Sequence, residues 1–197
     1  MVDVLPMTIY CAVMSITPGP NNMMLTASGA RFGYRGALPQ ILGILVGGFA
    51  MTAVSCLGLG ALFVAWPPAR AGLRIVGALY LAWLAWRLCG ARAGEAAVRR
   101  PLSFAEGALF QLVNPKGWLK AVTLGSAFMP AGIAPELAAL LVSFVGLVVG
   151  FPCISAWAMF GVAIRRVLRG PAQLRAFNLA LAGTLVVLAF TLLRASE

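Results

Sequence analysis

Two short segments of this sequence place prolines and polar residues inside apolar runs. Residues 15–22 read SITPGPNN, and residues 111–117 read QLVNPKG. Proline has no N–H, so the carbonyl four residues before it loses its helical partner. Each segment therefore predicts a helix break, with free carbonyl acceptors before the proline and free amide donors after it. A small zwitterion needs both kinds of group, since donors hold its carboxylate and acceptors hold its ammonium.

The carbonyls that the prolines release are expected to be those of Met14 and Ile16 in the first segment and Gln111 in the second. Beyond each break a new half-helix begins with its positive dipole end. Asn114 before Pro115 is a typical pair of N-cap and first helical residue. One of the two asparagines that end the first segment is expected to cap the other half-helix in the same way.

A lysine follows the second break. Lys116 lies deep in an apolar run, where a positive charge is costly and is therefore functional or paired. Lys120 lies one turn further on the same face and nearer the outer interface, where its side chain can snorkel towards water. Glu106 is too far from Lys116 for a local pair and is interpreted as marking the membrane interface. The predicted substrate-binding residues are Pro18, Gly19, Pro20, Asn21, Asn22, Gln111, Asn114, Pro115 and Lys116.

The composition indicates which elements position these groups. The chain has 197 residues, of which 61% are hydrophobic and 10% charged, and its mean hydropathy is +0.95. The stretches without any charged residue are 4–30, 36–69, 137–164 and 176–193. Each can supply a membrane span of about 20 apolar residues. We therefore predict an all-α membrane protein whose six transmembrane helices cover residues 5–27, 38–64, 71–89, 104–129, 136–163 and 176–194.

The order of the spans predicts an internal repeat. The longest polar segment, residues 90–103, divides a single transmembrane transporter domain (residues 1–197) into halves of about 1–90 and 103–197. Spans one and four run in opposite directions, so similar halves form an inverted repeat, which is typical of secondary transporters. Each proline break lies roughly 17–20 Å along its span, near the middle of a core about 30 Å thick. We therefore predict two inverted three-helix repeats whose helices 1 and 4 are broken at proline motifs.

Basic residues predict the orientation. The loops after spans one, three and five hold most of them: Arg31, Arg35, Arg92, Arg99, Arg100, Arg165, Arg166, Arg169 and Arg175. Loops rich in arginine stay in the cytoplasm. This rule predicts a cytoplasmic linker at residues 90–103 and both termini on the opposite side of the membrane.

Several function classes are excluded by what the sequence lacks. The net charge of +10 is explained by these loops, and no basic face predicts nucleic-acid binding. The four cysteines are scattered and the sequence has no histidine, so we predict no metal site and no cofactor. The lack of histidine also excludes histidine-dependent hydrolases. Asp3 is the sole aspartate, which excludes an aspartyl protease. A passive channel, a carrier for another small polar metabolite, and an intramembrane enzyme built on Arg and Glu remain as alternatives.

At this point the sequence resembles the LysE/RhtB family of amino-acid exporters. The resemblance rests on SITPGPNN in the first span and LVNPKGWL in the fourth, and it runs over nearly the whole chain. It implies a multi-pass carrier of the bacterial inner membrane, with periplasmic termini, that exports amino acids or close derivatives and is driven by protons. The doubled asparagine and the QLVNPK form are similar to the branch that exports cysteine and O-acetylserine.

Two glycine pairs leave the oligomeric state open. Gly43 and Gly47, and likewise Gly146 and Gly150, form small-xxx-small patterns that let helices approach closely. Such patterns serve helix packing within a chain or the contact of a homodimer, and we interpret them as packing.

Overall fold

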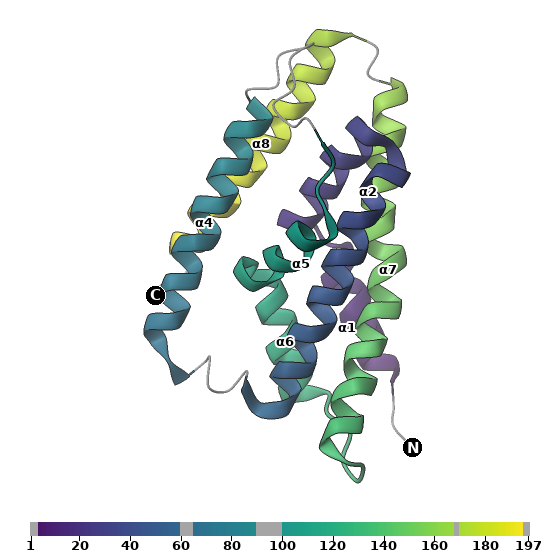
Figure 1. Ribbon diagram of the computed structural model, residues 1–197, viewed down its shortest axis with the longest axis vertical. Coiled ribbons are helices and arrows are strands. Elements are labelled where there is room, and N and C mark those ends of the chain that lie inside the picture. Colours follow the sequence, from purple (N-terminus) through teal and green to yellow (C-terminus); the bar gives the residue numbers. More distant parts are fainter. Residues whose placement is uncertain (1–3, 60–64, 90–99, 168–169, 195–197) are drawn as a thin grey trace.

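Helices form all the regular structure that the computed structural model describes, over residues 4–59, 65–89, 100–167 and 170–194 (Figure 1). The elements are α1 (Leu5–Ile16), α2 (Pro20–Val54), the π-helical turn η1 (Ser55–Leu59), α4 (Pro67–Cys89), α5 (Phe104–Val113), α6 (Pro115–Ala127), α7 (Pro135–Val167) and α8 (Pro171–Arg194). The predicted all-α class is therefore confirmed within these ranges, while the arrangement as two inverted repeats stays a prediction.

Both proline motifs interrupt a helix. The first lies between α1 and α2, where Thr17 and Gly19 adopt extended conformations. The second lies between α5 and α6, where Asn114 alone is extended. The chain thus breaks where the prolines remove amide donors, as the sequence predicts.

A sharp reversal divides α2 into two arms, residues 20–32 and 34–54. Gly33 has φ 74° and ψ 175°, a conformation that glycine adopts readily. Ser28 Oγ donates a hydrogen bond of 2.7 Å to Gln40 Oε1. In a straight helix these residues would lie about 18 Å apart along the axis. The predicted first and second spans therefore form a helical hairpin around Gly33.

Helix ends differ by a few residues from the predicted spans. Both α4 and α8 begin at a proline that precedes the predicted start, since proline is favourable in a first helical turn. The second predicted span is α-helical only to Val54, where η1 begins. Residues 60–64 of that span and residues 90–99 of the predicted linker lie outside the described residues.

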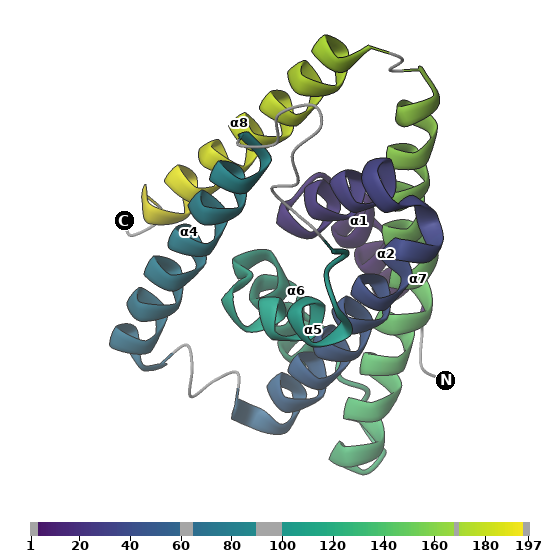
Figure 2. The same cartoon turned by 45° about the horizontal axis from the view of Figure 1, so that its top comes forward.

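The helices pack as two long pairs with α5 and α6 between them. Figures 1 and 2 show α4 beside α8 and α2 beside α7. Leu81 and Leu185 belong to a buried cluster that also contains Met24 of α2 and Phe110 of α5. This cluster joins the α4–α8 pair to the rest of the protein.

Glycines allow the closest helix contacts. A Cβ atom added to Gly29 of α2 would lie 2.0 Å from the carbonyl oxygen of Ala158 in α7. One added to Gly43 would lie 2.1 Å from the carbonyl oxygen of Phe104, and Gly47 packs against the same helix, α5. The packing interpretation of Gly43 and Gly47 is therefore confirmed within the chain.

The start of α5 is fixed by a capping box. Ser103 Oγ accepts from the Glu106 amide at 3.2 Å, and the Glu106 carboxylate accepts from the Ser103 amide at 2.8 Å. Glu106 Oε2 also lies 2.7 Å from Arg100 Nη1 in an ion pair. The hydrogen bond between these two side chains raises the pKa of the Arg100 guanidinium. Glu106 thus fixes the beginning of α5, while its position at the membrane interface stays a prediction.

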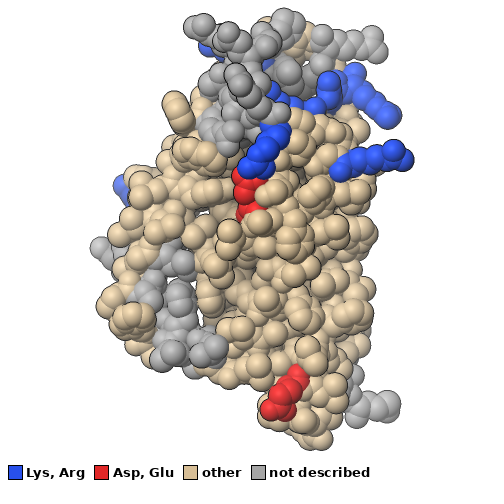
Figure 3. Space-filling model, viewed as in Figure 1, with Lys and Arg blue, Asp and Glu red and all other residues tan. Residues whose placement is uncertain are grey.

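The exterior is suited to lipid. Two helical stretches, Pro20–Gly58 and Pro135–Val167, are long and apolar enough to cross a membrane. Large apolar side chains such as Leu79 and Phe144 are exposed over most of their surface. On the face in Figure 3 most of the coloured basic side chains gather at one end of the molecule. At the α2 turn, Arg165 donates a hydrogen bond of 2.8 Å to the Arg31 carbonyl.

Candidate functional site

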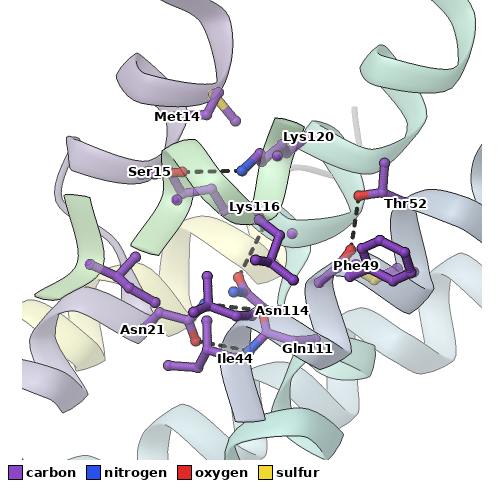
Figure 4. A pocket seen from close by; sticks show the side chains of 18 of the residues that line it. Met14, Ser15, Asn21, Ile44, Phe49, Thr52, Gln111, Asn114, Lys116 and Lys120 are labelled. Carbon is purple, nitrogen blue, oxygen red and sulfur yellow. Dashed lines mark hydrogen bonds between the residues drawn. The ribbon is translucent and has the colours of Figure 1, made fainter. Parts of the chain in front are cut away.

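A cavity lies between α1, α2, α5, α6 and α7, where the two breaks face each other (Figure 4). The empty space within and above it measures about 700 Å³ when the open solvent at its mouth is included. All the predicted substrate-binding residues line this cavity except Pro18 and Pro115. Gly146 and Gly150 of α7 also belong to its wall.

Carbonyls of the first break accept hydrogen bonds from side chains of α2 and α7. Asn22 Nδ2 donates to the carbonyls of Ser15 and Thr17, at 2.9 and 2.8 Å. Trp157 Nε1 of α7 donates to the Ile16 carbonyl at 3.0 Å. Asn22 therefore reaches back to two carbonyls at the end of α1, while Trp157 satisfies the Ile16 carbonyl that Pro20 releases.

The prediction that an asparagine caps the second half-helix of this break is wrong. The N-cap of α2 is Gly19, which has no side chain to accept a hydrogen bond. Asn21 instead points to Gln111 of α5. The first amides of α2 thus have no side-chain cap, and the residues that carry them line the cavity. Such a helix start favours an anion.

The second break is closed by its own residues. Asn114 Oδ1 accepts from the Lys116 amide at 3.2 Å, which confirms the predicted cap. The carbonyl of Gln111, predicted to be free, accepts from the Asn114 amide at 3.2 Å. The side-chain amides of Gln111 and Asn21 exchange two hydrogen bonds, of 3.0 and 3.2 Å, and so join the two breaks.

Lys116 makes the most direct contact between the breaks. Its Nζ atom donates to the Thr17 carbonyl at 2.7 Å, to Thr17 Oγ1 at 2.7 Å and to the Pro18 carbonyl at 3.2 Å. These oxygens lie at the C-terminal, negative end of α1, which favours a cation. A Cβ atom on Gly19 would lie 3.0 Å from Lys116 Cδ, so the glycine leaves room for this side chain.

Lys120 also belongs to the cavity, which corrects the interpretation that it snorkels to the interface. Its Nζ atom donates to Ser15 Oγ at 3.1 Å, and its side chain lies in the cavity wall (Figure 4). The spacing of four residues from Lys116 was the signal for this position. Both lysines of the sequence therefore face one cavity.

Sequence reasoning missed other polar groups at the site. Thr17 stands inside the first motif, but nothing in its type showed that its oxygens would receive Lys116. Trp157 of α7 and Ser143, which lines the cavity from the same helix, are distant in sequence and carry no local signal. Within the described ranges, no three metal-ligating side chains come together.

These features define a helical membrane protein with a polar cavity inside an apolar shell. The chain belongs to the LysE type translocator family, whose model matches residues 12–196. Members of this family are transporters and not enzymes, and its exporters are proteins of the inner membrane. The resemblance that the two motifs predict is therefore confirmed.

Individual relatives have a more specific description. The chain is 31% identical over 166 residues to the cysteine/O-acetylserine efflux protein of Escherichia coli (strain K12), which covers 81% of this chain and 83% of the relative. The proteins of the same name from Shigella sonnei (strain Ss046) and Escherichia coli O1:K1 match with the same identity and coverage. No solved structure matches the chain.

Proposed function

We propose that this protein is a secondary active transporter that exports amino acids or close derivatives and binds them in the cavity between the two breaks. The family and the efflux relatives support a substrate of this class. The observation that carries the binding site is the contact of Lys116 with the Thr17 and Pro18 oxygens. It brings a cation, backbone acceptors and an uncapped helix start to one place.

The substrate is held by both of its charged groups. Its ammonium takes the Thr17 and Pro18 oxygens, which in the structure accept from the Lys116 ammonium. Lys116 then turns to the substrate carboxylate, which also accepts from the first amides of α2. One lysine thus exchanges carbonyl partners for a carboxylate when substrate enters.

Transport requires the cavity to open alternately to each side. The contacts that join the breaks, Lys116 to Thr17 and Asn21 to Gln111, link residues about 90–100 positions apart and belong to the two proposed repeats. Rocking of one repeat against the other breaks these contacts on one side of the site. The arginine-rich end in Figure 3 faces the cytoplasm, and both termini are periplasmic.

We further propose that proton movement drives export. Glu106 is committed to the capping box and to Arg100, so its replacement by Gln leaves any proton dependence in place. Loss of proton-driven uptake in that variant, with exchange intact, would assign the coupling site to Glu106.

Counterflow in proteoliposomes tests the proposal. Vesicles loaded with unlabelled amino acid should accumulate labelled amino acid through the reconstituted full-length protein. A carrier exchanges substrate across the membrane, whereas a passive channel dissipates the gradient without accumulation. Absence of counterflow for every amino acid and derivative in a broad panel contradicts the proposal.

A further inference from the structure

A second set of polar side chains, those of Ser15 and Lys120, lies in the same cavity, away from the side-chain amides of Asn21 and Gln111. Figure 4 shows Asn21 and Gln111 on one side of Lys116, and Ser15 with Lys120 on the other. Ser15 is mostly buried, with 9% of its surface exposed. The proposed binding of a zwitterion uses Lys116 and leaves the Lys120 group without a role.

Lys120 has more donor capacity than the described residues satisfy. Its ammonium carries three N–H donors, and in the described ranges it makes one hydrogen bond, to the neutral Ser15 hydroxyl. The acidic residues there are Glu106, which pairs with Arg100, and Glu136 in the first turn of α7. Neither lies within 4.0 Å of Lys120. A charge in an apolar span calls for a counter-charge.

An unpartnered hydroxyl in the wall of the same cavity supports a ligand there. Ser143 lines the cavity from α7, is 1% exposed, and its Oγ atom has no hydrogen-bond partner among the described residues. A buried polar atom without a partner is unfavourable, because it loses its hydrogen bonds to water without replacement. Most such atoms in native structures are satisfied, so a ligand with acceptor atoms explains Ser143.

We infer that Lys120, with Ser15 and Ser143, forms a side-chain subsite that selects amino acids whose side chain ends in a carboxylate. This inference rests on the proposed function and deepens it. Lys116 and Lys120 lie four residues apart on one helix face, where Cβ atoms are about 5–6 Å apart. Lysine ammonium groups stand on flexible four-carbon side chains, so these two can each reach one of the two carboxylates of a short acidic amino acid. Each lysine thus receives one carboxylate, and the ammonium goes to the Thr17 and Pro18 oxygens.

The test compares near-isosteric substrates in the reconstituted full-length protein. Counterflow of labelled aspartate is measured against asparagine, and glutamate against glutamine. A hydrogen bond between charged groups predicts a preference of about ten-fold or more for the acidic member of each pair. This wild-type ratio needs no variant. Equal exchange of both members overturns the inference and leaves the proposed function standing.

Single substitutions show which side chains produce the preference for the acidic substrate. Lys120→Met should bring the aspartate-to-asparagine ratio close to one, while Lys120→Arg should retain most of the preference. Ser143→Ala should lower the ratio by a few-fold. Arg35→Met, which removes an exposed positive charge near the α2 turn, is the matched control and should leave the ratio unchanged. Membrane abundance of every variant is measured, and a full preference in Lys120→Met overturns the inference.

A free anion is the other source of the same chemistry. The wild type is therefore assayed with neutral amino acids in buffers that contain chloride, phosphate or a large impermeant anion. Exchange that does not depend on the buffer anion supports a side-chain carboxylate as the ligand. Exchange that needs a small inorganic anion, and loses this need in Lys120→Met, overturns the inference in favour of a co-transported ion. If no amino acid exchanges at all, the proposed function fails and the subsite fails with it.

Discussion

The two proline breaks look alike in sequence but differ in what their residues contact. The first separates α1 from α2 by residues 17–19, and α2 begins at Pro20 with Gly19 as an N-cap that has no side chain. The second is a single residue, Asn114, whose side chain caps α6. The first break therefore presents backbone acceptors and donors, whereas the second is closed locally and presents side chains.

This difference makes the cavity between the two breaks asymmetric. Lys116 and Gln111 project from the second break to Thr17 and Asn21 of the first. Two copies of either break would supply backbone groups without the cation, or the cation without open acceptors. A zwitterion has unlike ends, so a site that binds it gains from halves that have diverged.

The largest expected effect follows from removing the cation of the second break. Lys116→Met keeps the length and helix propensity of the side chain but has no charge. A hydrogen bond to a charged group contributes about 1.5–3 kcal/mol, which is roughly ten- to a hundred-fold in affinity. Counterflow should therefore be abolished or severely weakened, while the amount of folded protein in the membrane is retained.

Arg35→Met is the control for this prediction, because it removes one exposed charge outside the cavity. If Lys116→Met lowers abundance and the surviving protein transports at the normal rate, Lys116 stabilises the fold. The difference between the first break, which presents backbone groups, and the second, which presents a lysine, would then have no role in transport.

The next effect follows from removing the side chain that serves the first break. Asn22→Ala leaves the Ser15 carbonyl, which accepts from Asn22 at 2.9 Å, without this donor. A buried unsatisfied group costs about 1–3 kcal/mol. We expect a lower unfolding temperature in detergent and a lower abundance. Asn178→Ala on α8, outside the cavity, is the matched control, and equal destabilisation by both variants contradicts the role of Asn22.

The breaks themselves could be predicted from sequence because their causes are local. Proline removes a donor from its own helix, and the cap by Asn114 involves an amide two residues away. Gly33 lies between the predicted first and second spans, where a glycine readily adopts the positive φ of a turn. The bounds of α7 also agree with an uncharged stretch between Glu136 and Arg165.

The partners across the cavity could not be predicted in this way. Lys116 and Thr17 are 99 residues apart, and Trp157 and Ile16 are 141 apart, so their contacts depend on how the halves pack. An asparagine of the first motif is expected to cap the helix that follows it. The Asn22 side chain instead turns back, because the carbonyls at the end of α1 compete for its amide donor. The place of Lys120 in the cavity depends in the same way on a distant partner, since Lys120 and Ser15 are 105 residues apart.

A smaller effect follows from removing the local cap of the second break. Asn114→Ala should lower stability by about 1 kcal/mol, which is typical of an N-cap. Asn114→Ser should recover most of this loss, since serine is also a favourable cap. Thermal unfolding in detergent measures both variants. A loss in Asn114→Ala that exceeds that of Asn22→Ala would show that the second break depends less on local contacts than its geometry indicates.

The smallest effect follows from changing one acceptor of the first break. Thr17→Val keeps the shape of the side chain and the Thr17 backbone carbonyl but removes Oγ1, which lies 2.7 Å from Lys116 Nζ. A single neutral hydrogen bond contributes about 0.5–1.5 kcal/mol, and the main-chain oxygens of residues 17 and 18 remain. We therefore expect a few-fold rise in the half-saturating substrate concentration, which Thr17→Ser should reverse.

Thr184→Val is the matched control, because Thr184 Oγ1 donates a hydrogen bond to the Ala180 carbonyl on α8, outside the cavity. If Thr17→Val is as damaging as Lys116→Met, the hydroxyl rather than the backbone is the main acceptor. The first break would then act through a side chain, as the second does, and the contrast between them would be lost.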